Sequence, residues 1–163
     1  MDRTGKIIGR MTEVFGADIR RINHALKVYG FAVAIGGGEG FDAGLMEGLR
    51  YAAVLHDVGI AVSEKKYGSS AGRYQELEGP PVARAILESE GVDPAMTERI
   101  CFLIGHHHTY AGIDGPDYQA LVEADFLVNA FEDALSPDAI RSVKTKLFRT
   151  AAGTALLSRL YGV

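Results

Sequence analysis

Four side chains suited to binding a divalent cation lie within apolar, helix-like segments that are far apart in the sequence. They are His24, the adjacent pair His56 and Asp57, and Asp125. Burying a lone carboxylate or imidazole costs free energy unless the group is paired or binds a metal. We therefore expect a helical fold that brings these four side chains to one interior point.

Three of the four residues follow the spacing of apolar helix faces, in which apolar residues recur at i, i+3, i+4 and i+7, and Asp57 directly follows one of them. The faces combine His24 with Val28, Phe31 and Ile35, His56 with Leu45, Leu49, Ala52 and Ala53, and Asp125 with Leu121, Ala124 and Val128. Two imidazoles and two carboxylates form a complete ligand set for a divalent ion. Any one of these residues alone could instead be a hydrogen-bonded core group, and Asp125 could pair with an arginine. The set as a whole favours a metal site.

Helical patterns run through almost the whole chain. We predict helices over about 9–35 (one long helix or two consecutive ones), 42–57, 82–90, 93 to about 106–108, 118–135, from 137 onward and 151–161. The glycine-rich residues 36–40 are expected to form a linker, and residues 61–79 and 109–117 to form loops. The predicted fold is an all-α, single-domain helical bundle.

Composition limits the classes of function. The 163 residues and the 47% hydrophobic content suit one compact domain with a real core. The net charge of −4 argues against binding nucleic-acid polymers, whereas a bound cation could still attract a small phosphorylated substrate. The single cysteine, Cys101, fits a reducing cytoplasm, and neither a signal sequence nor a membrane-spanning run is expected.

The segment Tyr51–Gly59 (YAAVLHDVG) resembles the signature of the HD-domain metal-dependent phosphohydrolases. The family pattern is an upstream histidine, a His-Asp pair and a distant aspartate that often follows alanine. His24, His56-Asp57 and Ala124-Asp125 match it in order, and the resemblance extends from about His24 to Phe131. It implies an HD-type helical bundle over 1–163, with a core at about 20–135 and C-terminal helices at 136–162. It also implies hydrolysis of phosphate esters, usually of nucleotides.

The ligand types predict how such a reaction would proceed. Two neutral histidines and two carboxylates balance the charge of one divalent ion per chain and leave coordination positions open. We expect metal-bound hydroxide to attack phosphorus while Asp57 orients the water. Mixed nitrogen and oxygen ligands suit Mn, Fe, Co, Ni or Zn, and Mg is also acceptable.

Three consecutive histidines, His106, His107 and His108, form a second cluster of candidates. His107 continues the apolar stripe of Ile100, Leu103 and Ile104, so it is expected to point inward. In two-metal relatives a His-His pair occupies this region, and the resemblance places His107 and His108 there, with His106 as a further candidate. We expect these histidines to contact the substrate or to support the first metal rather than to bind a second metal. They could instead favour the carboxyl end of a helix electrostatically.

The two-metal relatives carry another histidine at the start of the preceding helix, where this chain has Gln75. Glu76 or Glu78 could replace it as a ligand or act as a general base. Alternatively, both glutamates could simply favour a helix amino terminus.

The segment that follows the His-Asp pair contains Lys65, Lys66 and Arg73. These cations could clamp phosphate oxygens beside the metal, or they could belong to a solvated surface loop.

The leading hypothesis is a cytoplasmic phosphomonoesterase that acts on a small phosphorylated molecule, with a nucleotide as the first candidate. The alternatives are a phosphodiesterase for a cyclic or signalling nucleotide, a non-catalytic metal-containing nucleotide sensor, and a metal-free helical scaffold. A homodimer is left open.

Overall fold

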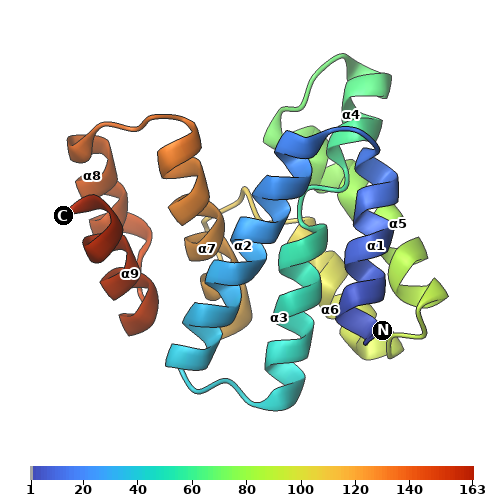
Figure 1. Cartoon of the computed structure of the whole chain (residues 1–163), viewed down its shortest axis with the longest axis horizontal. Coiled ribbons are helices and arrows are strands. Elements are labelled where there is room, and N and C mark those ends of the chain that lie inside the picture. Colours follow the sequence, from blue (N-terminus) through green and yellow to red (C-terminus); the bar gives the residue numbers. More distant parts are fainter. Residues whose placement is uncertain (1) are drawn as a thin grey trace.

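The computed structural model describes residues 2–163, and these residues form nine α-helices and no strand. In chain order the helices are α1 (Arg3–Phe15), α2 (Ile19–Gly38), α3 (Ala43–Leu55), α4 (Ile60–Tyr67), α5 (Gly72–Ser89), α6 (Pro94–Ile104), α7 (Pro116–Glu132), α8 (Pro137–Leu147) and α9 (Ala151–Tyr161). The all-α prediction is confirmed (Figure 1). None of the helices in this range is long and apolar enough to span a bilayer.

Short polar side chains begin several helices where the sequence predicted them. Asp42 accepts a hydrogen bond from the backbone N–H of Leu45 at 2.8 Å and starts α3. The long helical pattern predicted over 9–35 is two consecutive helices, because Gly16 ends α1 with a positive φ of 59°.

The prediction of a loop over 61–79 is wrong, because α4 and the first half of α5 occupy this segment. The prediction that a helix starts only at residue 82 is also wrong, since α5 begins at Gly72 and runs through Pro80 and Pro81. Close packing explains the difference. A Cβ on Gly59 would lie 2.6 Å from the backbone nitrogen of Gly79, so the turn after the His-Asp pair lies directly against α5. This long-range contact outweighs the local preference of proline for a helix start.

The glycine-rich segment also differs from the prediction. Gly36, Gly37 and Gly38 form the last turn of α2, and the chain leaves the helix only afterwards. Gly36 is buried, and a Cβ at this position would lie 2.8 Å from the side chain of Met46. The glycine lets α2 approach α3 closely at this point.

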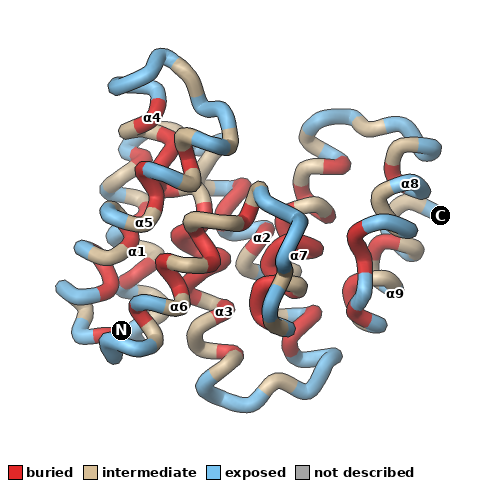
Figure 2. The backbone as a smooth tube through the Cα atoms, turned by 180° about the vertical axis from the view of Figure 1, so that it is seen from behind, coloured by how far each residue is buried: buried red, intermediate tan, exposed pale blue. Residues whose placement is uncertain are grey.

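Helix α3 lies at the centre of the bundle beside α2, α6 and α7, and α8 and α9 pack at one side (Figure 1). Every residue from Tyr51 to His56 is buried, which is typical of a helix enclosed on all sides. Figure 2 shows the buried segments concentrated in this central region. The carboxyl end of α3 therefore delivers His56 and Asp57 to the interior.

A fully buried glutamate fixes the C-terminal pair of helices. Glu123 of α7 accepts hydrogen bonds from the backbone nitrogens of Arg149 at 2.6 Å and Thr150 at 3.0 Å. These bonds hold the connection between α8 and α9 against α7, so this buried carboxylate has a structural explanation.

Candidate metal centre

The four predicted ligands lie together in the interior. His24 comes from the second turn of α2, His56 and Asp57 directly follow α3, and Asp125 comes from the middle of α7. The Nε2 atoms of His24 and His56 are 3.2 Å apart. The Oδ1 atom of Asp125 lies 3.1 Å from Nε2 of His24 and 3.6 Å from Nε2 of His56.

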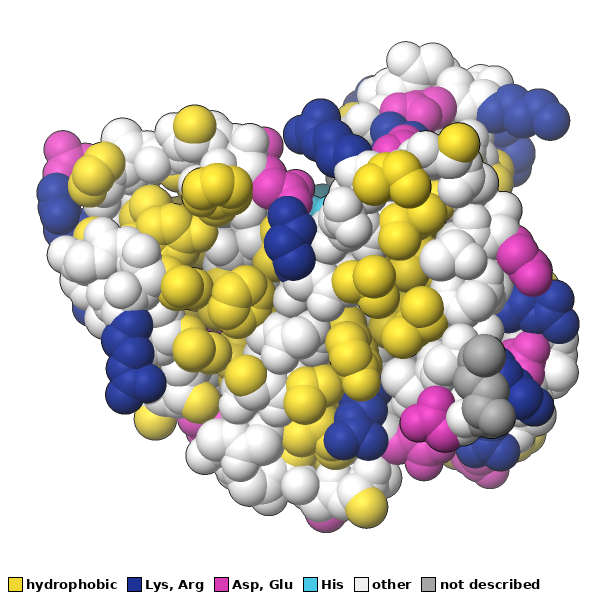
Figure 3. All heavy atoms as spheres, viewed as in Figure 1, with side chains coloured by type: hydrophobic (Ala, Val, Ile, Leu, Met, Phe, Trp, Pro, Cys, Tyr) yellow, Lys and Arg dark blue, Asp and Glu magenta, His cyan; other side chains and the backbone are white. Residues whose placement is uncertain are grey.

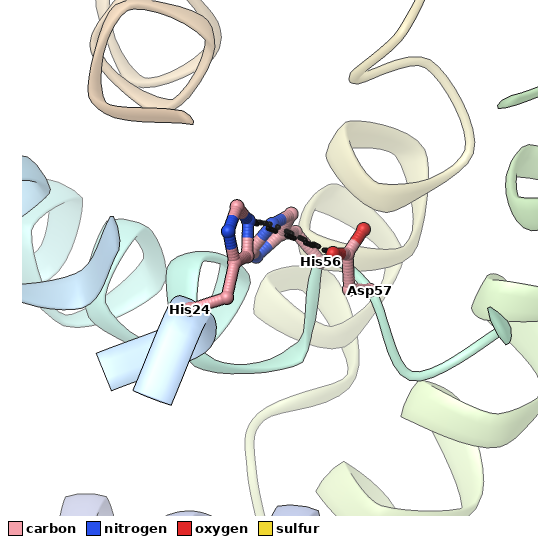
Figure 4. Close-up of side chains that lie close together, drawn as sticks. All are labelled: His24, His56 and Asp57. Carbon is pink, nitrogen blue, oxygen red and sulfur yellow. Dashed lines mark hydrogen bonds and ion pairs between the residues drawn. The ribbon is translucent and has the colours of Figure 1, made fainter. Parts of the chain in front are cut away.

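Asp57 completes this arrangement from the turn after α3. Its Oδ2 atom lies 3.6 Å from Nε2 of His24 and 3.5 Å from Nε2 of His56. Figure 4 shows the three side chains pointing toward one another. One ligand atom from each of them lies within 4.8 Å of the others, a spacing that could hold a metal ion. The donor set of two imidazoles and carboxylates suits a divalent cation.

Two buried histidines are oriented by backbone carbonyls. The Nδ1 atom of His56 lies 2.8 Å from the carbonyl oxygen of Ala53, and Nδ1 of His107 lies 2.7 Å from that of Ile104. Because a carbonyl oxygen only accepts hydrogen bonds, each Nδ1 must carry the proton and donate. When such a ring binds a cation it is neutral, and its lone pair then lies on Nε2, which faces the candidate centre.

The sequence analysis missed two side chains that contact the predicted ligands. The Oε2 atom of Glu132 lies 2.9 Å from Nδ1 of His24, and Asn129 donates from Nδ2 to Oδ1 of Asp125 at 2.9 Å. Both lie on α7, with Asn129 four residues and Glu132 seven residues after Asp125. Extending the helical face of Asp125 by two turns would have identified them.

The buried charges perturb one another strongly. Burial opposes protonation of His24, but the carboxylates of Asp125, Asp57 and Glu132 outweigh it and raise the pKa of His24 to about 9. Burial disfavours ionised Asp57, but the neighbouring His56 and His107 lower its pKa to about 2. The carboxylates therefore stay ionised at neutral pH and create a site that attracts positive charge.

A second ligand group shares Asp57. The other oxygen of this residue, Oδ1, lies 3.4 Å from Nε2 of His107, and His108 completes a group whose ligand atoms lie within 4.8 Å of one another. Nε2 of His107 is buried and has no hydrogen-bond partner within residues 2–163. Such an orphaned atom fits a cation ligand. The geometry thus offers a second position beside the predicted one.

The remaining histidines have different surroundings. Burial lowers the pKa of His108 to about 4, so the ring is neutral at pH 7, and its Nε2 atom lies 3.2 Å from Oε1 of Gln75. His106 is turned toward Phe102, with 4.2 Å between the ring centroids, and its Nδ1 atom lies 2.7 Å from the carbonyl oxygen of that residue. His106 belongs to neither ligand group.

Both candidate general bases are engaged by other side chains. Glu78 accepts hydrogen bonds from Lys66 at 2.8 Å and from Tyr67 at 2.7 Å. Glu76 accepts from the backbone N–H of His108 at 3.0 Å and from the hydroxyl of Thr109 at 2.9 Å. Glu78 therefore links α5 to α4, and Glu76 supports the segment that carries the histidines.

A polar cavity of about 470 Å³ opens beside the candidate centre. It is lined by Asp18, Arg20, Arg21, His24, Asp57, Ile60, Ser70, Gln75, Asn129, Glu132 and Asp133. In Figure 3 a histidine side chain is visible in a notch bordered by basic and acidic side chains. The cations at this cavity come from α2.

The predicted phosphate-binding cations lie outside this lining. Lys65 is exposed near the end of α4, and Lys66 pairs with Glu78. Arg73 donates to the hydroxyl of Tyr74 at 2.8 Å and lies over its ring.

The chain belongs to the HD domain family, because the model of the HD domain matches residues 21–138. This range contains all four predicted ligands. The fold is also similar to a crystal structure of a predicted HD superfamily hydrolase from an uncultured Thermotogales bacterium. The two share 24% sequence identity with a TM-score of 0.70, over 96% of this chain and 83% of that chain. No curated protein matches significantly. Family membership and the ligand groups support a metal-dependent hydrolase.

Proposed function

We propose that this protein is a metal-dependent phosphohydrolase that cleaves a small phosphate monoester, with a nucleotide as the first candidate substrate. One observation carries the proposal. Three helical segments bring His24, His56, Asp57 and Asp125 together beside a polar cavity. The Nε2 atom of each histidine lies 3.1–3.6 Å from that of the other histidine and from a carboxylate oxygen of each aspartate.

In the proposed centre, His24 and His56 would hold a divalent cation through Nε2, and Asp57 and Asp125 would offset its charge. A cation held there would lower the pKa of water and polarise a phosphoryl oxygen. Asp57 lines the cavity and stays ionised, so it can accept a hydrogen bond from the attacking water and orient it. The water oxygen bonds to phosphorus, the ester P–O bond breaks, and the leaving alkoxide takes up the proton that the water releases.

The proposed substrate class rests on the cavity. Its volume of about 470 Å³ is typical of a site for a small molecule. Arg20 and Arg21 line it, and we propose that they attract the phosphate group. Arg20 is exposed at the cavity, whereas Arg21 already binds Glu64 at 2.5 Å. Arg20 is therefore the more available of the two cations.

A specific observation favours a second candidate, a phosphodiesterase for a cyclic or signalling nucleotide. Asp57 belongs to both ligand groups, and two adjacent cations could clamp the attacking and leaving oxygens of a phosphodiester. The products distinguish the two candidates, since a monoesterase releases inorganic phosphate and a diesterase releases a phosphomonoester.

The test is a hydrolysis assay of the untagged protein loaded with Mn, Co, Ni, Zn or Mg. The panel contains nucleoside monophosphates, non-nucleotide monoesters and cyclic nucleotides. We expect inorganic phosphate release from monoesters, and its loss in Asp57→Asn. Tight nucleotide binding without turnover under every metal would contradict the proposal and favour a sensor.

A further inference from the structure

We propose that Glu132 is a positioning residue for His24, and that Lys27 holds Glu132 in this role. The inference deepens the proposed function, because it rests on His24 being a ligand of the cation. It adds to the candidate centre a carboxylate and an ammonium that hold one ligand in place without contacting the cation.

The geometry places Glu132 behind the histidine ring. Glu132 is the last residue of α7, two turns after Asp125, so α7 supplies both one candidate ligand and the partner of another. Its Oε2 atom lies 2.9 Å from Nδ1 of His24, whereas Nε2 on the other edge of the ring faces His56 and Asp125. The Glu132 side chain is only 15% exposed, which limits competition from water.

This contact selects one tautomer of His24. Oε1 of Glu132 is paired with Lys27, and its Oε2 atom faces Nδ1 of His24, so the carboxylate is the acceptor in this hydrogen bond. Nδ1 must then carry a proton, and in the neutral ring the lone pair lies on Nε2. His56 and His107 obtain the same tautomer from carbonyl oxygens. A carboxylate partner additionally makes the imidazole a more basic ligand.

Lys27 holds the other oxygen of the carboxylate. Its Nζ atom binds Oε1 of Glu132, and Lys27 lies three residues after His24 on α2. The lysine lines an apolar groove of about 230 Å³, with Phe31, Leu127, Val128, Phe131, Leu160 and Tyr161. Figure 3 shows this gathering of hydrophobic side chains beside a basic side chain. An apolar surface of this kind suits the lysine stem and favours a position with the ammonium on Glu132.

The neighbouring Asp133 provides a matched control. It lines the same cavity and carries the same charge, but it is exposed and forms no hydrogen bond or ion pair with an imidazole within residues 2–163. Removing its charge changes the field at the cavity without changing the orientation of His24. A comparison of the two positions separates positioning from general electrostatics.

The experiment measures Co²⁺ binding by wild type and by Glu132→Met, Glu132→Gln and Asp133→Asn. The affinity comes from competition with a chelator, and proton NMR of the Co²⁺ protein detects the hyperfine-shifted ring N–H protons that exchange with water. For Glu132→Met we expect an affinity about 10–100-fold lower than wild type and loss of one ring N–H resonance. Glu132→Gln should retain that resonance, because an amide oxygen also accepts, with a smaller loss of affinity. Asp133→Asn should stay within about threefold of wild type.

Two results would overturn the inference. One is wild-type affinity with every ring N–H resonance present in Glu132→Met, and the other is an equal loss of affinity in Asp133→Asn. If Glu132→Met fails to fold, Lys27→Met decides: we expect faster exchange of the same resonance with water, and an unchanged exchange rate would refute the role of Lys27. Failure of wild type to bind Co²⁺ at all would instead reject the proposed centre, and the inference with it.

Discussion

Oδ1 of Asp57 lies 3.4 Å from Nε2 of His107, while its Oδ2 faces the other two buried histidines. One carboxylate therefore connects two potential cation positions. The turn that carries Asp57 is fixed by the close approach of Gly59 to Gly79. A Cβ atom on Gly59 would lie only 2.6 Å from the backbone nitrogen of Gly79. The position of Asp57 thus depends on the packing of α5 as well as on the sequence of the His-Asp pair.

Replacing Asp57 should remove activity without unfolding the protein. In Asp57→Asn we expect cation affinity to fall by more than about 100-fold, since losing an outer partner alone costs 10–100-fold. Thermal stability should fall only modestly, because the variant loses the attraction of His56 and His107 together with the repulsion of Asp125. Phosphate release and thermal unfolding measure the two effects, with Asp133→Asn as the control. Wild-type turnover by Asp57→Asn would contradict the assigned role.

Replacing His107 should affect the second cation position selectively. In His107→Gln we expect one cation fewer per chain at saturation, while the position formed by His24 and His56 still fills. The reason is that His107 forms a ligand group with Asp57 and His108 and does not belong to the group of His24, His56 and Asp57. Equilibrium dialysis with Mn²⁺ measures the stoichiometry. An identical stoichiometry in wild type and variant would argue against a second position.

The chelated protein should lose stability as the pH rises through 9. The pKa of His24 is raised to about 9 from its ordinary value of 6.5, so its contribution is fully present below pH 6.5 and is lost as the pH passes 9. The free energy of unfolding should fall by about 3 kcal/mol over this pH range. Asp57 has the opposite pH dependence. Its pKa is lowered to about 2, so its contribution to the free energy of unfolding is lost only in strong acid.

Urea unfolding in the presence of a chelator at pH 6 and pH 9.5 measures this difference. In the His24→Asn variant, most of this difference in the free energy of unfolding should disappear. With a cation bound, stability should instead increase with pH, because the metal competes with the proton on Nε2. The same free energy of unfolding at both pH values in the chelated wild type would contradict the prediction.

Glu78 should prove structural rather than catalytic. Its contacts with Lys66 and Tyr67 tie α4 to α5, so Glu78→Gln should lower the midpoint of thermal unfolding. We expect kcat to stay within about threefold of wild type, and Lys66→Met to behave similarly. A stable Glu78→Gln variant with a 100-fold lower kcat would restore the general-base hypothesis.

The periodicity of the sequence predicted that His24, His56 and Asp125 face inward, and Asp57 joined the candidate ligands as the neighbour of His56. It could not predict their partners, because a helical stripe identifies a face and not the helix packed against it. Glu132 illustrates this limit, since its contact with His24 joins residues 108 positions apart. Similarly, the continuation of α5 through Pro80 depends on the packing of Gly79 against Gly59. The local preferences of proline and glycine cannot predict this long-range contact.

The most direct test of the account is the metal content of untagged wild type and Asp125→Ala, measured by elemental analysis. We predict at least about one transition-metal ion per chain in wild type and its loss in the variant, because Oδ1 of Asp125 lies 3.1 Å from Nε2 of His24. A wild-type protein that is empty as purified and takes up no added Mn, Co or Ni would contradict the central claim.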